Sequence, residues 1–250
     1  MHSLRPASLL YAGIIALAAL PFERATAQTA DERLKTDWPY LQRYQTENAA
    51  LSPPKAGENR VVFMGNSITE GWAKYFPTMF AGKPYINRGI GGQTTSQMLV
   101  RFRPDVLALD PDVVVILAGT NDVAGNSGPI APEAIENNLA SMAELAKAHG
   151  VRVVLASILP VADDKKDAAG QPLNRTTDRP PATLRAINAW MSDYARRNGH
   201  VYLDYASAVA DATGGFKADL NNDGLHPNPA GYAIMAPLAE QAIAKALQGG

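Results

Sequence analysis

Short runs of aliphatic and β-branched residues alternate along the chain with longer segments whose apolar residues recur at helical spacing. We predict a β-strand at each short run, because such runs bounded by turn residues are typical of buried strands. The five predicted strands are residues 60–65, 85–89, 113–118, 151–157 and 201–205. Strands that alternate with helices usually form one parallel sheet covered by helices, so the pattern predicts an α/β fold.

The longer segments predict amphipathic helices at residues 131–148 and 183–197, each followed by a glycine that is typical of a helix end. A last helix is expected to begin at Pro229, behind Asn228 as its N-cap, and to end near residue 247. Residues 161–181 are polar and have no clear period, which predicts a long surface loop of the kind that often carries function.

The N-terminal segment has the features of a secretory signal peptide. Arg5 precedes an apolar run at residues 7–20, and the pattern Ala-Thr-Ala follows at residues 25–27. The run is shorter than the roughly 20 apolar residues that span a bilayer, which argues against a membrane anchor. We therefore expect cleavage after Ala27 and export to the periplasm or the medium.

Composition fits one main domain. The chain has 250 residues, of which 46% are hydrophobic and 19% charged. After the signal peptide (1–27) we expect a short helical lead-in (28–59) and one globular domain (60–250). The formal net charge of −1 and the absence of a dense Lys/Arg stripe argue against nucleic acid as a partner. Because the sequence has no cysteine, any catalysis must use oxygen or nitrogen groups.

Four short polar motifs follow the predicted strands. They are GNSITEG at 65–71, NRGIGGQTT at 87–95, GTND at 119–122 and DGLHPN at 223–228. Ligands of open parallel sheets bind beyond the carboxyl ends of the strands, so we expect these motifs to meet at one edge and to form the functional site.

Each motif also has a purely structural interpretation. Ser67 suits a helix N-cap, and the glycines of NRGIGGQTT suit a tight turn. Asn121 and Asp122 suit a turn in which their side chains bond the local backbone. No single motif decides between structure and chemistry.

The histidines discriminate better, since a serine nucleophile needs a base. His2 is in the predicted signal peptide, His149 is at a helix end and His200 is in a turn before a strand. Only His226 is in a strand-end motif, and it comes three residues after the carboxylate of Asp223. These two residues are the candidates for a base and its orienting group.

Residues 219–224 also match the opening of an EF-hand calcium loop. The match fails at the twelfth position, where the loop needs a bidentate glutamate and this chain has Ala230. We therefore expect no metal site here, and no cofactor.

Taken together, the four motifs resemble those of the SGNH (GDSL-like) hydrolases, a family named for its Ser, Gly, Asn and His, and in particular its acetyl esterase and platelet-activating-factor-acetylhydrolase-like branch. The resemblance covers roughly residues 60–247. It implies a three-layer α/β/α sandwich with a five-stranded parallel sheet, which is a flavodoxin-like fold. The G-x-S-x-G motif of α/β-hydrolases is absent at Ser67, where Thr69 takes the place of the second glycine.

The resemblance also implies roles for the residues. Ser67 would be the nucleophile, His226 its base and Asp223 the orienting group. The backbone N–H groups of Ser67 and Gly92 and the side chain of Asn121 would form the oxyanion hole. Gly89 and Gly91 remain alternatives to Gly92.

The polar segment 161–181 contrasts with the apolar trough that a long-chain lipase needs. With export and the resemblance, it favours a serine esterase for short, acetyl esters of a small molecule or carbohydrate. The alternatives are a thioesterase or lysophospholipase, or a non-catalytic glycan- or acyl-binding module. Trp72 and Arg88 lie beside the motifs, and we expect the first to pack in the core and the second to be a structural ion partner.

Overall fold

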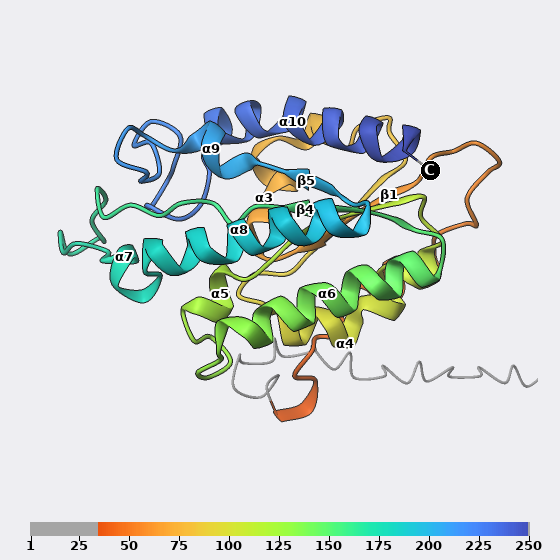
Figure 1. The fold of residues 1–250 in the computed structure, drawn as a ribbon, viewed down its shortest axis with the longest axis horizontal. Helices are drawn as coiled ribbons and strands as arrows, with labels where there is room; N and C mark the ends of the chain where they lie inside the picture. The colour runs from red at the N-terminus through yellow and green to blue at the C-terminus, as the bar shows by residue number, and fades with distance from the viewer. Residues whose placement is uncertain (1–34, 250) are drawn as a thin grey trace, which may run out of the picture.

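The computed structural model describes residues 35–249, so the signal peptide predicted at 1–27 lies outside the described residues. Five strands of this part form one parallel sheet in the order β2-β1-β3-β4-β5. The strands are β1 (Val61–Gly65), β2 (Tyr85–Gly89), β3 (Val113–Leu117), β4 (Arg152–Ala156) and β5 (Val201–Leu203). Figure 1 shows helices above and below this sheet, which confirms the predicted three-layer α/β/α fold.

The five predicted strands are all present, with differences of one or two residues at their ends. The largest difference is at β5, which ends at Leu203 instead of residue 205. The reason is Asp204, whose side chain accepts a hydrogen bond from Ser207 N at 3.0 Å and thereby caps helix α9 (Tyr205–Val209). The strand therefore stops where a capping carboxylate starts the next helix.

Two apolar cores lie on opposite faces of the sheet, and three helices cover each face. One core contains residues of α4 (Thr95–Asp105), α6 (Pro132–Ala148) and α8 (Pro181–Asn198). The other contains residues of α3 (Ser67–Tyr75), α9 and α10 (Pro229–Gln248). Alternate residues of each strand face alternate cores, which is why the central strands are apolar throughout.

The helix predictions agree closely with the structure. α6 begins at Pro132, and α8 begins at Pro181, two residues before the predicted start. Asn228 caps α10 as expected, since its side chain accepts a hydrogen bond from Gly231 N at 3.0 Å. In the predicted lead-in, helix α2 (Gln45–Ala49) is short and lies against α4.

The strand order has a functional consequence. The chain passes from β1 outward to β2 and then returns to the other side of β1 to form β3. Ligand sites of open α/β sheets lie where the order reverses in this way, beyond the carboxyl ends of the two strands concerned. Here those strands are β1 and β3, which lead into GNSITEG and GTND.

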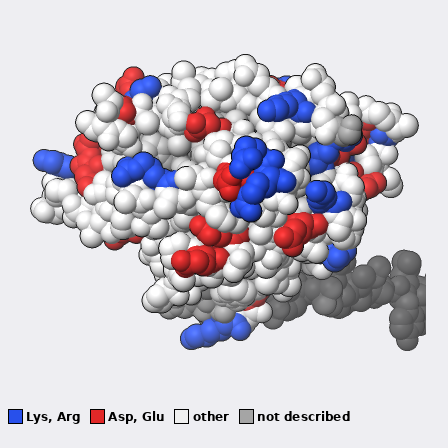
Figure 2. All heavy atoms as spheres, in the orientation of Figure 1, with Lys and Arg blue, Asp and Glu red and all other residues white. Residues whose placement is uncertain are grey.

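The surface carries charges of both signs. Figure 2 shows Lys and Arg side chains interspersed with Asp and Glu on this face, without a broad patch of either sign. None of the described helices has the length and apolar character that crossing a bilayer requires.

Candidate active site

Ser67 is the first residue of α3, directly beyond the carboxyl end of β1. The N-cap of this helix is Asn66, whose Oδ1 accepts a hydrogen bond from Ile68 N at 3.0 Å. The capping interpretation of Ser67 is therefore wrong. Its Oγ instead lies 2.9 Å from His226 Nε2, a residue 159 positions further along the chain.

His226 is held on its other side by Asp223, whose Oδ2 lies 2.9 Å from the ring Nδ1. The second carboxylate oxygen accepts from the backbone N–H of His226 at 2.8 Å and of Leu225 at 3.1 Å. Burial opposes ionisation of Asp223, but the hydrogen bonds from the His226 side chain and backbone outweigh it and hold the pKa of this carboxyl well below its usual range.

These bonds define the protonation of the ring. An ionised carboxylate only accepts hydrogen bonds, so Nδ1 of His226 carries the proton that faces Asp223. Nε2 of the neutral ring is then free to accept from the Ser67 hydroxyl. The arrangement can take a proton from Ser67, which is what a serine nucleophile requires.

The local fold of the last motif explains why Asp223 and His226 face each other. Asn222 N donates to His226 O at 2.8 Å, and Gly224 N donates to Asn221 Oδ1 at 2.6 Å. The loop is thereby closed on itself before Asn228 starts α10. Short-range bonds set much of its geometry, and Arg175 adds two bonds to Asp223 from outside the loop.

The three glycines left open by the sequence differ in what their N–H groups do. Gly89 N donates to Asn87 Oδ1 at 2.8 Å, and Gly91 N donates to Glu70 Oε2 at 2.9 Å. Gly92 N has no hydrogen-bond partner among the described residues. Of the three, Gly92 is therefore the one whose N–H remains available to a ligand.

The backbone at Gly92 and Gly89 also requires glycine, for two different reasons. Gly92 has φ +78°, in the left-handed region that side chains disfavour. At Gly89 a Cβ would lie 2.1 Å from Glu70 N, so this residue allows β2 and α3 to approach closely. A Cβ at the neighbouring Gly91 would lie 3.8 Å from Ser67 Cβ, which places this turn beside the candidate nucleophile.

Asn121 lies in the first turn of α5 (Thr120–Val123), beyond β3, and is buried. Its Nδ2 donates one hydrogen bond to Gln93 O at 2.9 Å, which leaves the second N–H of the amide. Asp122 accepts from Thr95 N at 2.9 Å and from the Thr95 hydroxyl. Both side chains thus bind the NRGIGGQTT segment, and Asp122 also accepts from its own backbone N–H, so the local-turn interpretation is wrong for Asn121 and holds in part for Asp122.

The buried side chain of Arg101 contacts two of these motifs, GNSITEG and NRGIGGQTT. It is fully buried in α4 and forms an ion pair with Asp105 at 3.0 Å. It also donates to Gly65 O at 3.1 Å and to the side-chain oxygen of Gln93. The end of β1 and the residue after Gly92 therefore share one buried cation.

Two arginines that were not among the predicted site residues also contact this site. Helix α7 (Arg175–Asp178) lies within the segment predicted as a loop, and Arg175 donates to Asp223 Oδ2 at 3.0 Å. Arg179, directly after α7, donates to Thr120 Oγ1 at 3.2 Å. The signal that could have found them is the Arg-x-x-x-Arg spacing, which puts two cations on one side of a helical turn.

The two residues expected beside the motifs have structural contacts. Trp72 is 1% exposed and packs on Tyr232 at 4.6 Å between ring centroids, which confirms the core assignment. Arg88 is buried, but the ion-partner interpretation is wrong. Its Nε donates to the neutral Asn48 at 2.8 Å and its guanidinium lies over the Tyr44 ring, and it forms no ion pair with a described carboxylate.

The other described histidines do not approach this site. His149 Nδ1 lies 2.8 Å from Leu145 O at the end of α6. His200 lies beside the ring of Tyr194, before β5. Among the described residues, no cluster of His, Asp and Glu has the arrangement of a metal site.

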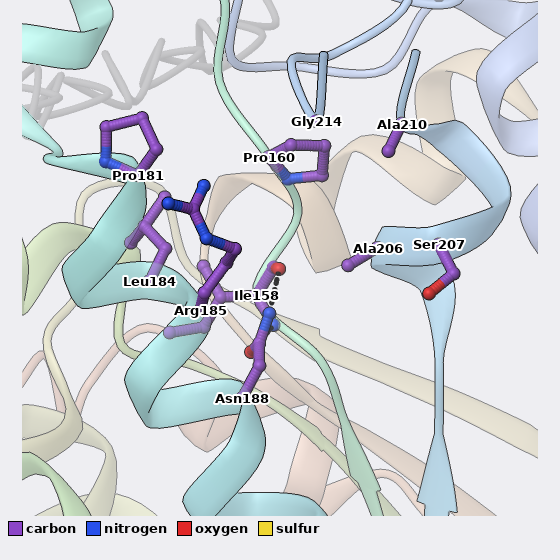
Figure 3. A pocket seen from close by; sticks show the side chains of 10 residues that line it. All are labelled: Ile158, Pro160, Pro181, Leu184, Arg185, Asn188, Ala206, Ser207, Ala210 and Gly214. Carbon is purple, nitrogen blue, oxygen red and sulfur yellow. Dashed lines mark hydrogen bonds between the residues drawn. The ribbon is translucent and has the colours of Figure 1, made fainter. Parts of the chain in front are cut away.

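Two cavities lie near the carboxyl edge of the sheet. One of about 230 Å³ adjoins the oxyanion candidate and is lined by polar and glycine residues and one tyrosine: Tyr40, Gly91, Gly92, Gln93, Gln97, Asn126 and Ser127. The other, of about 170 Å³, lies between α8 and α9 and has an apolar wall that includes Ile158, Pro160 and Leu184 (Figure 3). None of Ser67, His226 and Asp223 lines this second cavity.

Solved structures share this fold. A GDSL-like lipase from Bacteroides thetaiotaomicron is 44% identical, with a TM-score of 0.77, and the match covers 84% of this chain and all of that one.

Curated relatives are more distant. The esterase TesA of Pseudomonas aeruginosa is 29% identical over 177 residues, which cover 68% of this chain and 77% of TesA. An acetylxylan esterase of Geobacillus stearothermophilus is 26% identical over 159 residues, which cover 60% of this chain and 68% of that esterase. The chain spans about half the length of a third relative, the Bacillus subtilis lipoprotein YqeF, at 30% identity.

The sequence also matches a family directly. Residues 63–234, which contain all four motifs up to His226, match the GDSL-like Lipase/Acylhydrolase family. The chain therefore belongs to this SGNH-type family and is a carboxylic ester hydrolase.

Proposed function

We propose that this protein is an exported serine esterase that removes short acyl groups, in particular acetyl, from a carbohydrate or another polar alcohol. The observation that carries the mechanism is the chain of hydrogen bonds from Ser67 through His226 to Asp223, each step 2.9 Å long. The alternatives named from the sequence, a thioesterase or lysophospholipase and a binding module, make different predictions about acyl length and turnover.

The proposed reaction has two steps. Ser67 Oγ attacks the ester carbonyl while His226 Nε2 takes its proton, and the ring then gives that proton to the leaving alcohol. Water, deprotonated by the same nitrogen, cleaves the acyl-enzyme and releases the acid. Asp223 keeps the ring in the required tautomer and stabilises its charged form.

The negative charge on the carbonyl oxygen would be met by three donors. Ser67 N–H is one of the unpaired donors at the start of a helix, and Gly92 N–H has no partner among the described residues. The second N–H of Asn121 is the third. Such donors, fixed before the reaction, are a major source of catalysis in acyl transfer.

The choice of a polar substrate rests on the surroundings of Gly92. The 230 Å³ cavity beside it offers amide, hydroxyl and backbone groups, which suit sugar hydroxyls better than an alkyl chain. The similarity to an acetylxylan esterase agrees with this choice. Export is supported by the sequence pattern of residues 1–27 and by the similarity to a lipoprotein.

The experiment is a rate profile of the mature protein on p-nitrophenyl esters from acetyl to decanoyl, with acetate release from an acetylated oligosaccharide measured in parallel. We expect kcat/KM to be highest for acetyl and to fall with chain length, and Ser67→Ala to abolish turnover. A maximum at octanoyl or longer would favour the lysophospholipase or thioesterase alternative. Binding of the oligosaccharide without any turnover would favour the module.

A further inference from the structure

Arg179 is a buried cation next to the candidate active site, and the carboxylates that act on its charge, Asp178 and Asp223, are not in ion-pair contact with it. It is 6% exposed, yet it forms no ion pair with any described carboxylate. Its Nε donates to Thr120 Oγ1 at 3.2 Å, and Thr120 precedes the oxyanion candidate Asn121. Burying a charge without a partner is costly, so a guanidinium kept here calls for an explanation beyond packing.

The two terminal nitrogens of this guanidinium are the informative ones. Neither has a hydrogen-bond partner among the described residues, yet neither is among the buried polar atoms that lack one. Both nitrogens therefore keep some accessible surface, although the side chain as a whole is buried. The planar fork of a guanidinium can bind a carboxylate with two parallel hydrogen bonds.

The backbone holds Arg179 firmly in this place. Its own N–H donates to Arg175 O at 3.0 Å, and Pro180 and Pro181 follow it at the start of α8. A residue before proline has few accessible backbone conformations, so little backbone freedom is lost when a ligand binds. The backbone of Arg179 is thus held in place before the substrate arrives.

Helix α7 and the residue that follows it contact two different parts of the candidate site. Arg175, four residues earlier, contacts Asp223, while Arg179 contacts Thr120. The helix thus spans from the residue that orients His226 to the residue beside the oxyanion candidate. The acetyl group of the proposed substrate carries no further substituent, so any charged group that Arg179 binds belongs to the alcohol part of the ester.

We propose that Arg179 forms an anion subsite for a carboxylate on the alcohol part of the ester, as in an acetylated sugar acid. This inference rests on the proposed esterase function and deepens it. The subsite would distinguish acidic from neutral sugars, while the polar cavity beside Gly92 accepts hydroxyl groups common to both.

The test compares two acid probes, 3- and 4-acetoxybenzoate, with the amides of the same shape, 3- and 4-acetoxybenzamide. Within each pair the acetyl group and the shape of the leaving phenol are the same, and the substituent is charged only in the acid. For the wild type we expect kcat/KM to be about 10-fold higher for at least one acid than for its amide. In Arg179→Gln that preference should fall to about 1, because hydrolysis of the acid should fall more than hydrolysis of the amide.

Two controls separate charge recognition from structure. Arg185 on α8 points into the apolar-walled cavity of Figure 3, so Arg185→Gln should keep the preference. Arg179→Lys keeps the charge but not the fork and should keep part of it. If Arg179→Gln does not fold, Arg179→Lys and the salt dependence of the wild type test the proposal instead. The wild-type preference for the acid should become smaller when the salt concentration rises from about 20 to 500 mM.

Equal wild-type rates on acids and amides would overturn the subsite, as would an equal loss of both activities in Arg179→Gln. The second result would mean that Arg179 only supports Thr120. Failure of the wild type to hydrolyse any of the four probes would instead count against the proposed esterase function. The two failures are therefore distinguishable.

Discussion

Arg175 Nη2 lies 3.0 Å from Asp223 Oδ2, the same carboxylate oxygen that faces the ring of His226. A second bond, from Arg175 Nε to Asp223 O at 3.1 Å, fixes the backbone of the same residue. The orienting carboxylate is therefore itself oriented, by a side chain from the segment 161–181, whose polar sequence predicts a loop. Several consequences of this network are measurable.

Replacing Arg175 by glutamine should lower kcat by a few-fold, without abolishing activity. The pair is partly exposed, with 21% and 31% of the two side chains accessible, so the ion pair contributes on the order of 1 kcal/mol or less. Steady-state kinetics on p-nitrophenyl acetate measures the effect. A loss as large as that of Ser67→Ala would mean that Arg175 acts in the chemistry directly.

Asp223 should make stability depend on pH in a defined direction. Its folded-state pKa lies below the unfolded value of about 4, so the bonds to His226 stabilise the fold above that pH and are lost as the pH falls through the folded pKa. We expect Asp223→Asn to be less stable than wild type at pH 6, with the gap in Tm narrowing below about pH 4. A gap that stays constant between pH 6 and pH 3 would contradict this.

The strands and the start of the last helix could be predicted because their signals lie within short stretches of the sequence. Five apolar runs gave five strands, and the cap at Asn228 gave the start of α10. His226 and Asp223 were found for a similar reason, since only one histidine stands in a strand-end motif.

Long-range contacts were not predictable in this way. Nothing near Arg175 or Arg179 in the sequence identifies Asp223 and Thr120 as their partners, 48 and 59 residues away. The ion-partner prediction for Arg88 failed because its neighbours in the folded chain include an amide and an aromatic ring. The choice among three glycines needed the partners of their N–H groups, which only the folded chain defines.

Asn121→Ala should lower kcat by about 100-fold, because it removes one of three proposed donors to the oxyanion. KM should change much less, since that charge develops only in the transition state. Thermal unfolding of the same variant is the control, because the mutation also removes the bond to Gln93 O. A variant that keeps its Tm and its kcat would exclude Asn121 from the oxyanion hole.

Glu70 offers a test of the glycine assignment. Its carboxylate accepts from Gly91 N at 2.9 Å and so holds the turn that presents Gly92 N–H. We expect Glu70→Ala to lower kcat by roughly 10-fold, and Glu70→Gln, which can still accept this bond, to retain most activity. If both variants were as active as wild type, the turn would not need this support.

The buried pair of Arg101 and Asp105 should matter for stability. Asp105→Ala leaves a buried guanidinium without its counter-ion, which costs about 3–5 kcal/mol in the free energy of unfolding. The double replacement Arg101→Met with Asp105→Leu removes both charges and should be less destabilising than the single one. Denaturant unfolding of the two variants checks this order, and the reverse order would contradict it.

The central claim is that Ser67 is the nucleophile. Mass spectrometry of the mature protein after reaction with a fluorophosphonate tests it most directly, with hydrolysis of p-nitrophenyl acetate followed in the same sample. We predict one phosphonyl group, located on the peptide that contains Ser67, and loss of activity in step with labelling, while Ser67→Ala takes up no label and does not turn over. Labelling of a different residue, or wild-type turnover by Ser67→Ala, would contradict the account.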